Sequence, residues 1–215
     1  MKNHRIVQIS LLVLLILFSF VEKGFAQFTS TFQNAESVGK GKVEAVAWYT
    51  STSAGFEGER DGVLNIFGLM AGLGLSDKTE IRVRYDRLGL KEGEGEGFNN
   101  LTFGPKFSNE TGRFAFYLPF GIVFDEFDTN WMAEPSFILT FPIGENFLIN
   151  ATPSYMYPFG SEANFDDGLV KLNLGMEVKI DGDWRFRPEA TLMYFAESIG
   201  DGHFLNLGIA AAKRF

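Results

Sequence analysis

Apolar and polar residues alternate along most of the chain after residue 40, and this period of two limits the possible folds more than any other feature. From Val170 to Ile180 every even position is Val, Leu, Met or Ile, whereas the odd positions are Lys, Asn, Gly and Glu. Successive side chains of a β-strand point to opposite faces, so this stretch predicts a strand with one apolar and one polar face. Residues 112–124 and 183–196 repeat the pattern.

The chain after residue 40 predicts an all-β fold, an up-and-down meander of about ten antiparallel strands. Connections after even-numbered strands are short, as at 76–78 and 181–182, whereas most of those after odd-numbered strands are longer and acidic, as at 51–61 and 158–167. Short turns at one end and longer loops at the other are typical of transmembrane β-barrels. The expected strands are 41–50, 62–75, 79–88, 97–107, 112–124, 130–141, 146–157, 168–180, 183–196 and 203–215.

Alternation alone does not say whether the apolar face points inward, as in a soluble barrel, or outward against lipid. The apolar face carries large side chains at nearly every position of the last eight strands, for example from Phe114 to Phe124. A barrel of about ten strands has no interior room for so many large residues. We therefore expect the apolar face to contact lipid, with aromatic girdles at both ends that include Trp131, Tyr157 and Trp184.

The charged side chains on the opposite, inward parity are the candidate functional residues, expected to line the lumen and set its selectivity. With Lys179 and Arg214, which share this parity, nine basic residues face five acidic ones. One interpretation is that they pair with one another and fill a narrow barrel, since buried charges usually need partners. The other is a small water-filled path that mildly favours anions. The candidates are Glu80, Arg82, Arg84, Asp86, Lys106, Arg113, Glu134, Lys171, Glu177, Arg185, Arg187 and Glu189.

The amino terminus is expected to be a cleaved signal peptide. A basic start precedes the apolar run Ser10–Val21, and Gly24 and Ala26 place small residues before Gln27. A membrane anchor is the alternative, but the run is shorter than the roughly 20 residues that a spanning helix needs. The polar segment that follows is expected either in the periplasm or tucked into the lumen. The predicted organisation is a signal peptide at 1–26, a short polar segment at 27–39 and the barrel at 40–215.

The last strand ends the chain on Phe215, with Leu205, Leu207 and Ile209 in the same parity and Lys213 interrupting it. In this the chain resembles bacterial outer-membrane β-barrel proteins, whose final phenylalanine is read by the assembly machinery. The resemblance implies the outer membrane of a Gram-negative bacterium, contact with its lipid and lipopolysaccharide, and Phe215 as the assembly signal. The opening of the barrel, Asn34–Glu44, is similar to the start of the first strand in a group of outer-membrane transporters that resemble the barrel proteins of phenol meta-pathway degradation.

Composition excludes several kinds of chemistry. The chain has no cysteine, which excludes disulfides and Cys-ligated metals, and its net charge of -8 disfavours nucleic acid as a partner. No metal-ligand or cofactor pattern is visible. His203 is the one histidine after the predicted cleavage site, and it shares the lipid-facing parity, so we expect no enzyme. The carboxylates that a hydrolase at the rim would need are Asp125, Asp128, Asp166, Asp167 and Asp201.

These observations favour a transporter-like or pore-like barrel for small solutes, with a narrow charged lumen. The alternative is a non-conducting barrel with a structural, adhesive or partner-binding role. A hydrolase at the rim is the least favoured hypothesis, because a general base must be positioned by a second group and His203 lies on the wrong face.

Overall fold

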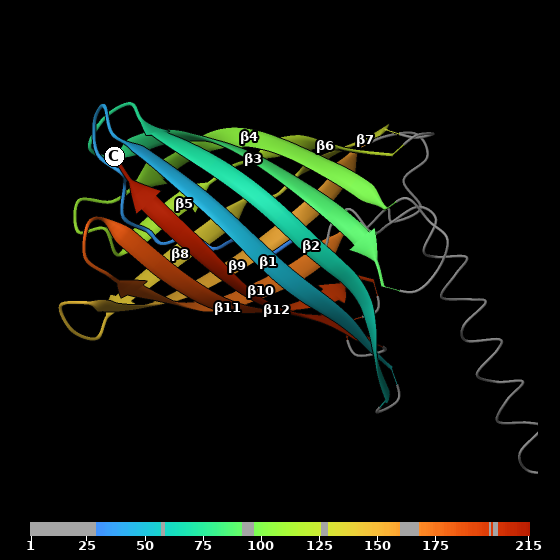
Figure 1. The fold of residues 1–215 in the computed structure, drawn as a ribbon. Helices are drawn as coiled ribbons and strands as arrows, with labels where there is room; N and C mark the ends of the chain where they lie inside the picture. The colour runs from blue at the N-terminus through green and yellow to red at the C-terminus, as the bar shows by residue number, and fades with distance from the viewer. Residues whose placement is uncertain are drawn as a thin grey trace, which may run out of the picture.

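One antiparallel sheet closes on itself, because β1 pairs with β12 and β9 pairs with β10 (Figure 1). The computed structural model describes residues 29–56, 59–91, 97–125, 129–159, 168–197, 199 and 202–215; the expected signal peptide lies outside them. The strands are β1 (Val43–Phe56), β2 (Glu59–Gly74), β3 (Thr79–Leu90), β4 (Phe98–Ser108), β5 (Phe114–Tyr117), β6 (Phe120–Phe124), β7 (Thr129–Ala133), β8 (Ser136–Pro142), β9 (Phe147–Phe159), β10 (Leu169–Lys179), β11 (Trp184–Phe195) and β12 (His203–Arg214).

Two pairs of these segments are halves of single strands, so the described barrel has ten strands, as predicted. β5 and β6 both pair with β4, and Pro119 lies between them. β7 and β8 both pair with β9, and Pro135 lies between them. Proline has no N–H to donate to the ladder, which accounts for both interruptions.

The expected loop at 51–61 is wrong. β1 continues to Phe56 and β2 begins at Glu59, and the pairing of β1 with β12 extends to Gly55 opposite His203. The Ser, Thr and Gly residues of this stretch suggested a loop because they carry no apolar alternation. The inward residues Thr50, Thr52 and Ala54 are buried but small, so no row of large apolar side chains marks this part of the strand, and the pairing with β2 and β12 defines it.

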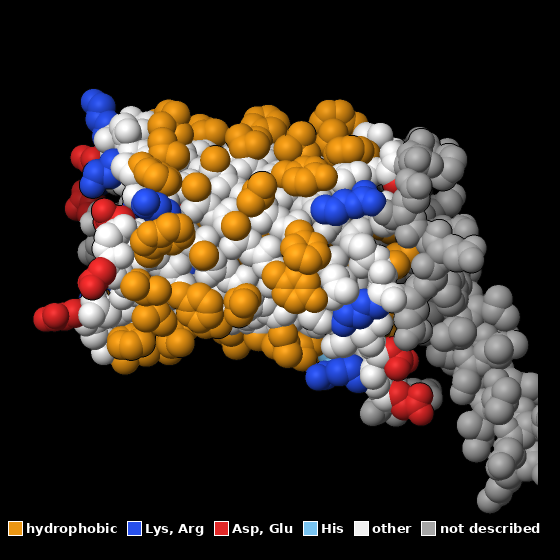
Figure 2. Space-filling view, in the orientation of Figure 1, with side chains coloured by type: hydrophobic (Ala, Val, Ile, Leu, Met, Phe, Trp, Pro, Cys, Tyr) orange, Lys and Arg blue, Asp and Glu red, His pale blue; other side chains and the backbone are white. Residues whose placement is uncertain are grey.

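The outer wall is apolar and the inner one polar at mid-barrel, as the parity predicts. Leu174 is 53 % exposed and Leu207 56 %, whereas their neighbours Asn173 and Asn206 are buried. Figure 2 shows hydrophobic side chains over the wall and charged side chains toward its two ends. Among the described residues there is no helix long and apolar enough to cross a bilayer.

The carboxyl terminus lies at the short-turn end of the barrel (Figure 1). The Phe215 N–H donates to the Val43 carbonyl at 2.8 Å, and the Val43 N–H donates back at 3.2 Å. The Phe215 ring is 67 % exposed, and the Lys213 ammonium lies 5.1 Å from its centroid. The last strand is thus paired to its end, with the final aromatic side chain on the surface.

Candidate functional site

The lumen is filled by the chain's own amino-terminal segment. Thr29 to Ala35 are each 4 % exposed or less, and Val38 is also buried. This stretch, residues 29–38, is called the lumen segment below; in Figure 1 it is the blue trace inside the barrel that leads to β1. Of the two expected locations for the polar segment, the lumen is therefore the one observed.

Side chains of the wall bind the backbone N–H groups of the lumen segment. The Glu189 carboxylate accepts hydrogen bonds from the Thr31 N–H at 2.7 Å and the Phe32 N–H at 2.8 Å. The Ala35 N–H donates to Thr140 Oγ1 at 2.8 Å, and the Val38 N–H donates to Glu80 Oε2 at 2.9 Å. Buried backbone groups need such partners, and here β3, β8 and β11 supply them.

Cationic side chains bind the carbonyl groups of the same segment. Arg187 Nη1 donates to the Phe32 carbonyl at 3.0 Å, and Lys106 Nζ donates to the Glu36 carbonyl at 2.8 Å. Arg84 donates to the Ser30 carbonyl. The lumen segment is therefore held by charged side chains on both its donors and its acceptors, and no strand ladder includes it.

One aromatic contact adds to these polar ones. Phe32 packs against Trp48 of β1, whose indole N–H donates to Asp86 Oδ1 at 3.1 Å. The Arg84 guanidinium carbon lies 4.5 Å from the Trp48 ring centroid, a cation–π distance. Space for the indole comes from Gly68 on β2, where a Cβ atom would lie 2.0 Å from the ring.

A buried ion-pair network crosses the lumen at the short-turn end. Glu44 lies at its centre and pairs with Arg187 at 2.7 Å, Arg214 at 3.1 Å and Arg82 at 3.2 Å. Glu80 extends it by pairing with Arg82 at 2.5 Å and with Lys106 at 2.9 Å. Glu177 pairs with Arg187 at 2.6 Å. The network thus links β1, β3, β4, β10, β11 and β12 from inside the barrel.

The remaining predicted lumen residues lie on other parts of the wall. Arg84 pairs with Asp86 at 2.7 Å, and Lys171 pairs with Glu134 at 2.7 Å. Arg185 is partly buried beside Glu177. Arg113 differs from the prediction: it is exposed in the turn before β5, because the strand begins one residue later at Phe114.

Sequence reasoning missed two acidic members of the site, Glu44 and Glu36. Glu36 lies in the lumen segment and contacts Lys179 at 3.5 Å and Arg214 at 3.3 Å. With these two added and Arg113 removed, eight basic side chains face seven acidic ones among the described lumen residues. The expected basic surplus of four is therefore reduced to one, and the basis for a preference for anions largely disappears.

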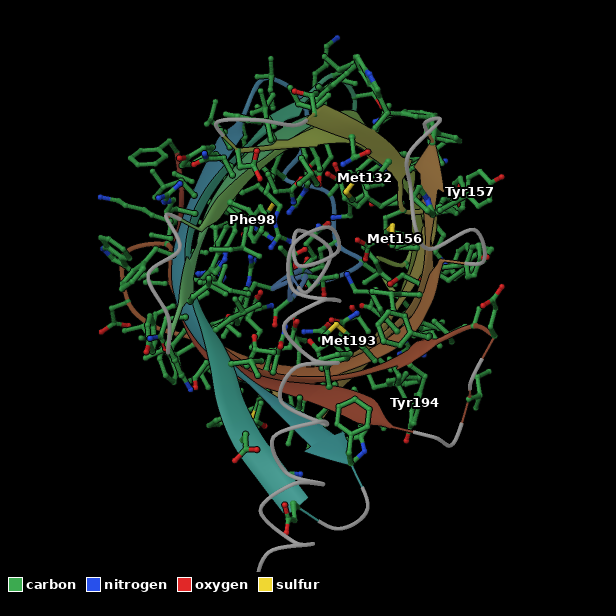
Figure 3. All side chains as sticks on the ribbon, turned by 90° about the vertical axis from the view of Figure 1, so that its right-hand side faces the viewer. Phe98, Met132, Met156, Tyr157, Met193 and Tyr194 are labelled. Atoms are coloured by element: carbon green, nitrogen blue, oxygen red, sulfur yellow. The ribbon has the colours of Figure 1, made fainter. Side chains whose placement is uncertain are left out.

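The loop end of the lumen is apolar, which the sequence analysis did not anticipate. Figure 3 looks into this end and shows Met132, Met156 and Met193 pointing inside the barrel, with Tyr157 on the outside. The inward row changes from polar to apolar toward this end on several strands, as from Asp86 to Leu88 on β3. The buried apolar cluster comprises Ala54, Leu64, Ile66, Leu88, Val123, Met132, Met156, Leu169, Met193 and Phe204.

The residues that a rim hydrolase would use are only partly described. The His203 ring lies 6.1 Å from the Tyr194 ring, and it is part of the outward row of β12 with Leu205. Of the candidate carboxylates, Asp125 is described and 128, 166, 167 and 201 lie outside the described residues. Within the part of the chain that the structure describes, no three His, Asp or Glu residues are grouped to hold a metal ion.

Comparison with solved structures finds membrane barrels. The translocator domain of the autotransporter NalP from Neisseria meningitidis has a TM-score of 0.47 at 7% identity, covering 88% of this chain and 91% of that one. An outer membrane channel from Pseudomonas putida F1 has a TM-score of 0.47 at 11% identity, with 87% and 100% covered. The attachment invasion locus protein Ail of Yersinia pestis has a TM-score of 0.38 at 14% identity, with 82% and 99% covered. No family model and no curated protein matches the sequence.

The closed antiparallel barrel and its apolar outer wall together define the class of protein. This chain is a transmembrane β-barrel. Its candidate site is the lumen, occupied by the lumen segment and crossed by the Glu44 network.

Proposed function

We propose that this outer-membrane barrel is closed at rest by its lumen segment, and that it passes small polar solutes when the segment is displaced. The supporting observation is how the segment is held. Many of its contacts run from wall side chains to its backbone, as between Glu189 and the Thr31 and Phe32 N–H groups, and others join side chains, as between Asn34 and Glu177. Contacts of this kind can break and re-form without disturbing the wall.

The barrel wall itself does not depend on the lumen segment. All ladder pairings join the named strands to one another, and closure occurs through the β1–β12 and β9–β10 pairs. The segment can therefore leave the lumen while every strand keeps both neighbours. What remains is a lumen with paired charges at the short-turn end, which should conduct weakly and with little ion selectivity.

A non-conducting barrel is the second candidate function, and one observation favours it. The ion pairs from Glu44 to Arg82 and Arg187 join β1, β3 and β11 inside the barrel and include no residue of the lumen segment. If they block passage even after the segment leaves, the loops rather than the lumen would carry the function. Conductance separates the two candidates.

The test is planar-bilayer conductance of Glu189→Ala in the full chain. Alanine removes the acceptor of the Thr31 and Phe32 N–H groups, so the lumen segment should leave more often and open events should become frequent. Glu189→Gln is the matched control, because it keeps one acceptor oxygen and should open less often than the alanine variant. Deleting residues 29–36 removes most of the lumen segment and should give the highest conductance of these variants. If that deletion is also silent, the pore proposal fails and the non-conducting role stands.

The proposal includes export and membrane assembly. Cleavage after Ala26 would leave a mature chain that begins two residues before the lumen segment. Outer-membrane lipid and lipopolysaccharide would contact the apolar wall, and the exposed Phe215 would be read by the assembly machinery. No catalytic role is proposed. Amino-terminal sequencing of protein from purified outer membranes tests cleavage and location together: residue 27 should come first, and protein in the inner membrane would contradict the proposal.

A further inference from the structure

Basic side chains lie on the outer wall close to the loop end of the barrel (Figure 2). Arg87 belongs to the outward row of β3, next in that row after Tyr85. Lys91 follows β3, and its ammonium group donates to Ser51 Oγ in the outward row of β1 at 2.7 Å. The Lys91 side chain reaches β1 over Gly62 of β2, where a Cβ atom would lie 2.8 Å from Nζ. Both cations are therefore on the outer surface rather than in the lumen.

The charges of the β1–β2 hairpin are sorted by face. Arg60 pairs with Gly55 of the outward row of β1, and paired residues of neighbouring strands share a face, so Arg60 lies on the outward side. Glu59 and Asp61, on either side of it, pair with members of the inward row. Among the described residues of β1, β2 and β3, the outward charges at the loop end are thus all basic. These residues, Arg60, Arg87 and Lys91, are called the basic band below.

The basic band begins where the apolar wall ends. The Tyr85 hydroxyl donates to Asn99 Oδ1 at 2.7 Å, and Arg87 Nη1 donates to the same oxygen at 3.3 Å. On the neighbouring strands the Tyr49 hydroxyl donates to Asn65 Oδ1 at 2.8 Å. Tyrosines with an apolar ring and a hydrogen-bonded hydroxyl mark the membrane–water interface of a barrel. The basic band therefore starts at the level of the lipid headgroups and extends away from the membrane centre.

We infer that the basic band binds the phosphate groups of a lipid headgroup in the leaflet around the loop end. The band continues the lipid-facing wall, and its charge is opposite to that of phosphate, for which guanidinium and ammonium groups are the usual protein partners. The inference rests on the outer-membrane location in the proposed function. In that membrane the leaflet around the loops contains lipopolysaccharide, so the partner is the phosphorylated lipid A part of that molecule.

The test is the binding of diphosphoryl lipid A to the purified protein in detergent, measured by native mass spectrometry. Arg87→Gln with Lys91→Gln removes two cations from the basic band and should weaken binding by roughly tenfold. The matched control is Lys40→Gln with Lys42→Gln, which removes two exposed cations from the short-turn end and should bind as the wild type does. Arg87→Lys with Lys91→Arg keeps both charges and should retain most of the binding.

Two further probes identify what is bound. Monophosphoryl lipid A should bind the wild type less tightly than the diphosphoryl form, and an excess of inorganic phosphate should not compete. Competition by inorganic phosphate would mean a site for a free anion and would overturn the inference. So would equal weakening in the basic-band and control variants, or no binding of lipid A by the wild type. Heat-dependent mobility in gels checks that each variant is folded.

These outcomes are separate from those that test the pore. If Glu189→Ala conducts but lipid A does not bind, the basic band has no lipid role and the proposed pore stands. If lipid A binds through the basic band while Glu189→Ala and the deletion of residues 29–36 are both silent, the pore fails and the lipid site stands.

Discussion

Phe32 of the lumen segment lies 5.8 Å from Trp48 of β1, ring centroid to ring centroid, with the two rings tilted by 32°. The Trp48 indole also contacts Arg84, which binds the Ser30 carbonyl. One wall residue therefore connects the lumen segment to the charged side chains of β3. Trp48 fits because β2 has a glycine, Gly68, opposite its ring. The position of the lumen segment is therefore fixed by Trp48 on β1, Gly68 on β2 and Arg84 on β3.

Gly68→Ala should disturb the packing of the lumen segment against Trp48. Its Cβ would meet the Trp48 ring at 2.0 Å, so the indole must move, at a cost of about 1–3 kcal/mol for overpacking. Tryptophan emission should shift as the Trp48 surroundings change. Gly72→Ala on the same face of β2 is the control, because its nearest contact is ordinary at 3.6 Å. Equal stability loss in both variants would contradict this account of Trp48.

Glu44→Ala should strongly destabilise the barrel. It leaves Arg82, Arg187 and Arg214 without a shared carboxylate, and breaking a buried pair costs about 3–5 kcal/mol. Urea unfolding in lipid vesicles measures the change in the free energy of unfolding.

The control for Glu44→Ala is Glu110→Ala, which breaks the exposed 2.7 Å pair with Lys78. The hydrogen bond from Lys78 holds the pKa of the Glu110 carboxyl below its usual value, but exposed pairs contribute little. The change in the free energy of unfolding caused by Glu110→Ala should therefore be hard to detect. If Glu44→Ala unfolds at the same urea concentration as Glu110→Ala, the network does not stabilise the wall.

Leu174→Arg should impair membrane assembly. Leu174 is 53 % exposed on the outer wall, and an arginine at mid-bilayer on a barrel costs about 2–4 kcal/mol. Leu174→Ala removes the same side chain without adding charge and should assemble normally. Outer-membrane yield and heat-dependent gel mobility report assembly. Normal assembly of the arginine variant would mean that this face does not contact lipid.

The barrel could be predicted from the sequence because its signal is local. The period of two assigns Leu174 outward and Asn173 inward from adjacent residues alone, and volume decides which face meets lipid. The turn residues predicted where most strands begin and end to within a few positions. The exception is the β1–β2 hairpin, which continues to Phe56 without an apolar row to mark it.

The contents of the lumen could be predicted only in part. The inward charges were found by parity, but the partners of the lumen segment lie far along the chain: Thr31 binds Glu189, 158 residues away. No local pattern encodes such a contact. The apolar loop end did have a signal, since Leu88 continues the inward row of Asp86 and Met193 that of Thr191. Glu44 was missed because the inward charges of the first strand were not counted.

The central claim is that the lumen segment closes the barrel reversibly, and a disulfide lock tests it most directly. Ser30 Oγ lies 3.1 Å from Thr191 Oγ1, and the chain has no cysteine, so Ser30→Cys with Thr191→Cys introduces one possible bond. The measurement is single-channel recording of this variant, oxidised and then reduced in the same bilayer, in the Glu189→Ala background. We predict silence while oxidised and frequent openings after reduction. Equal conductance in both states would contradict closure by the lumen segment.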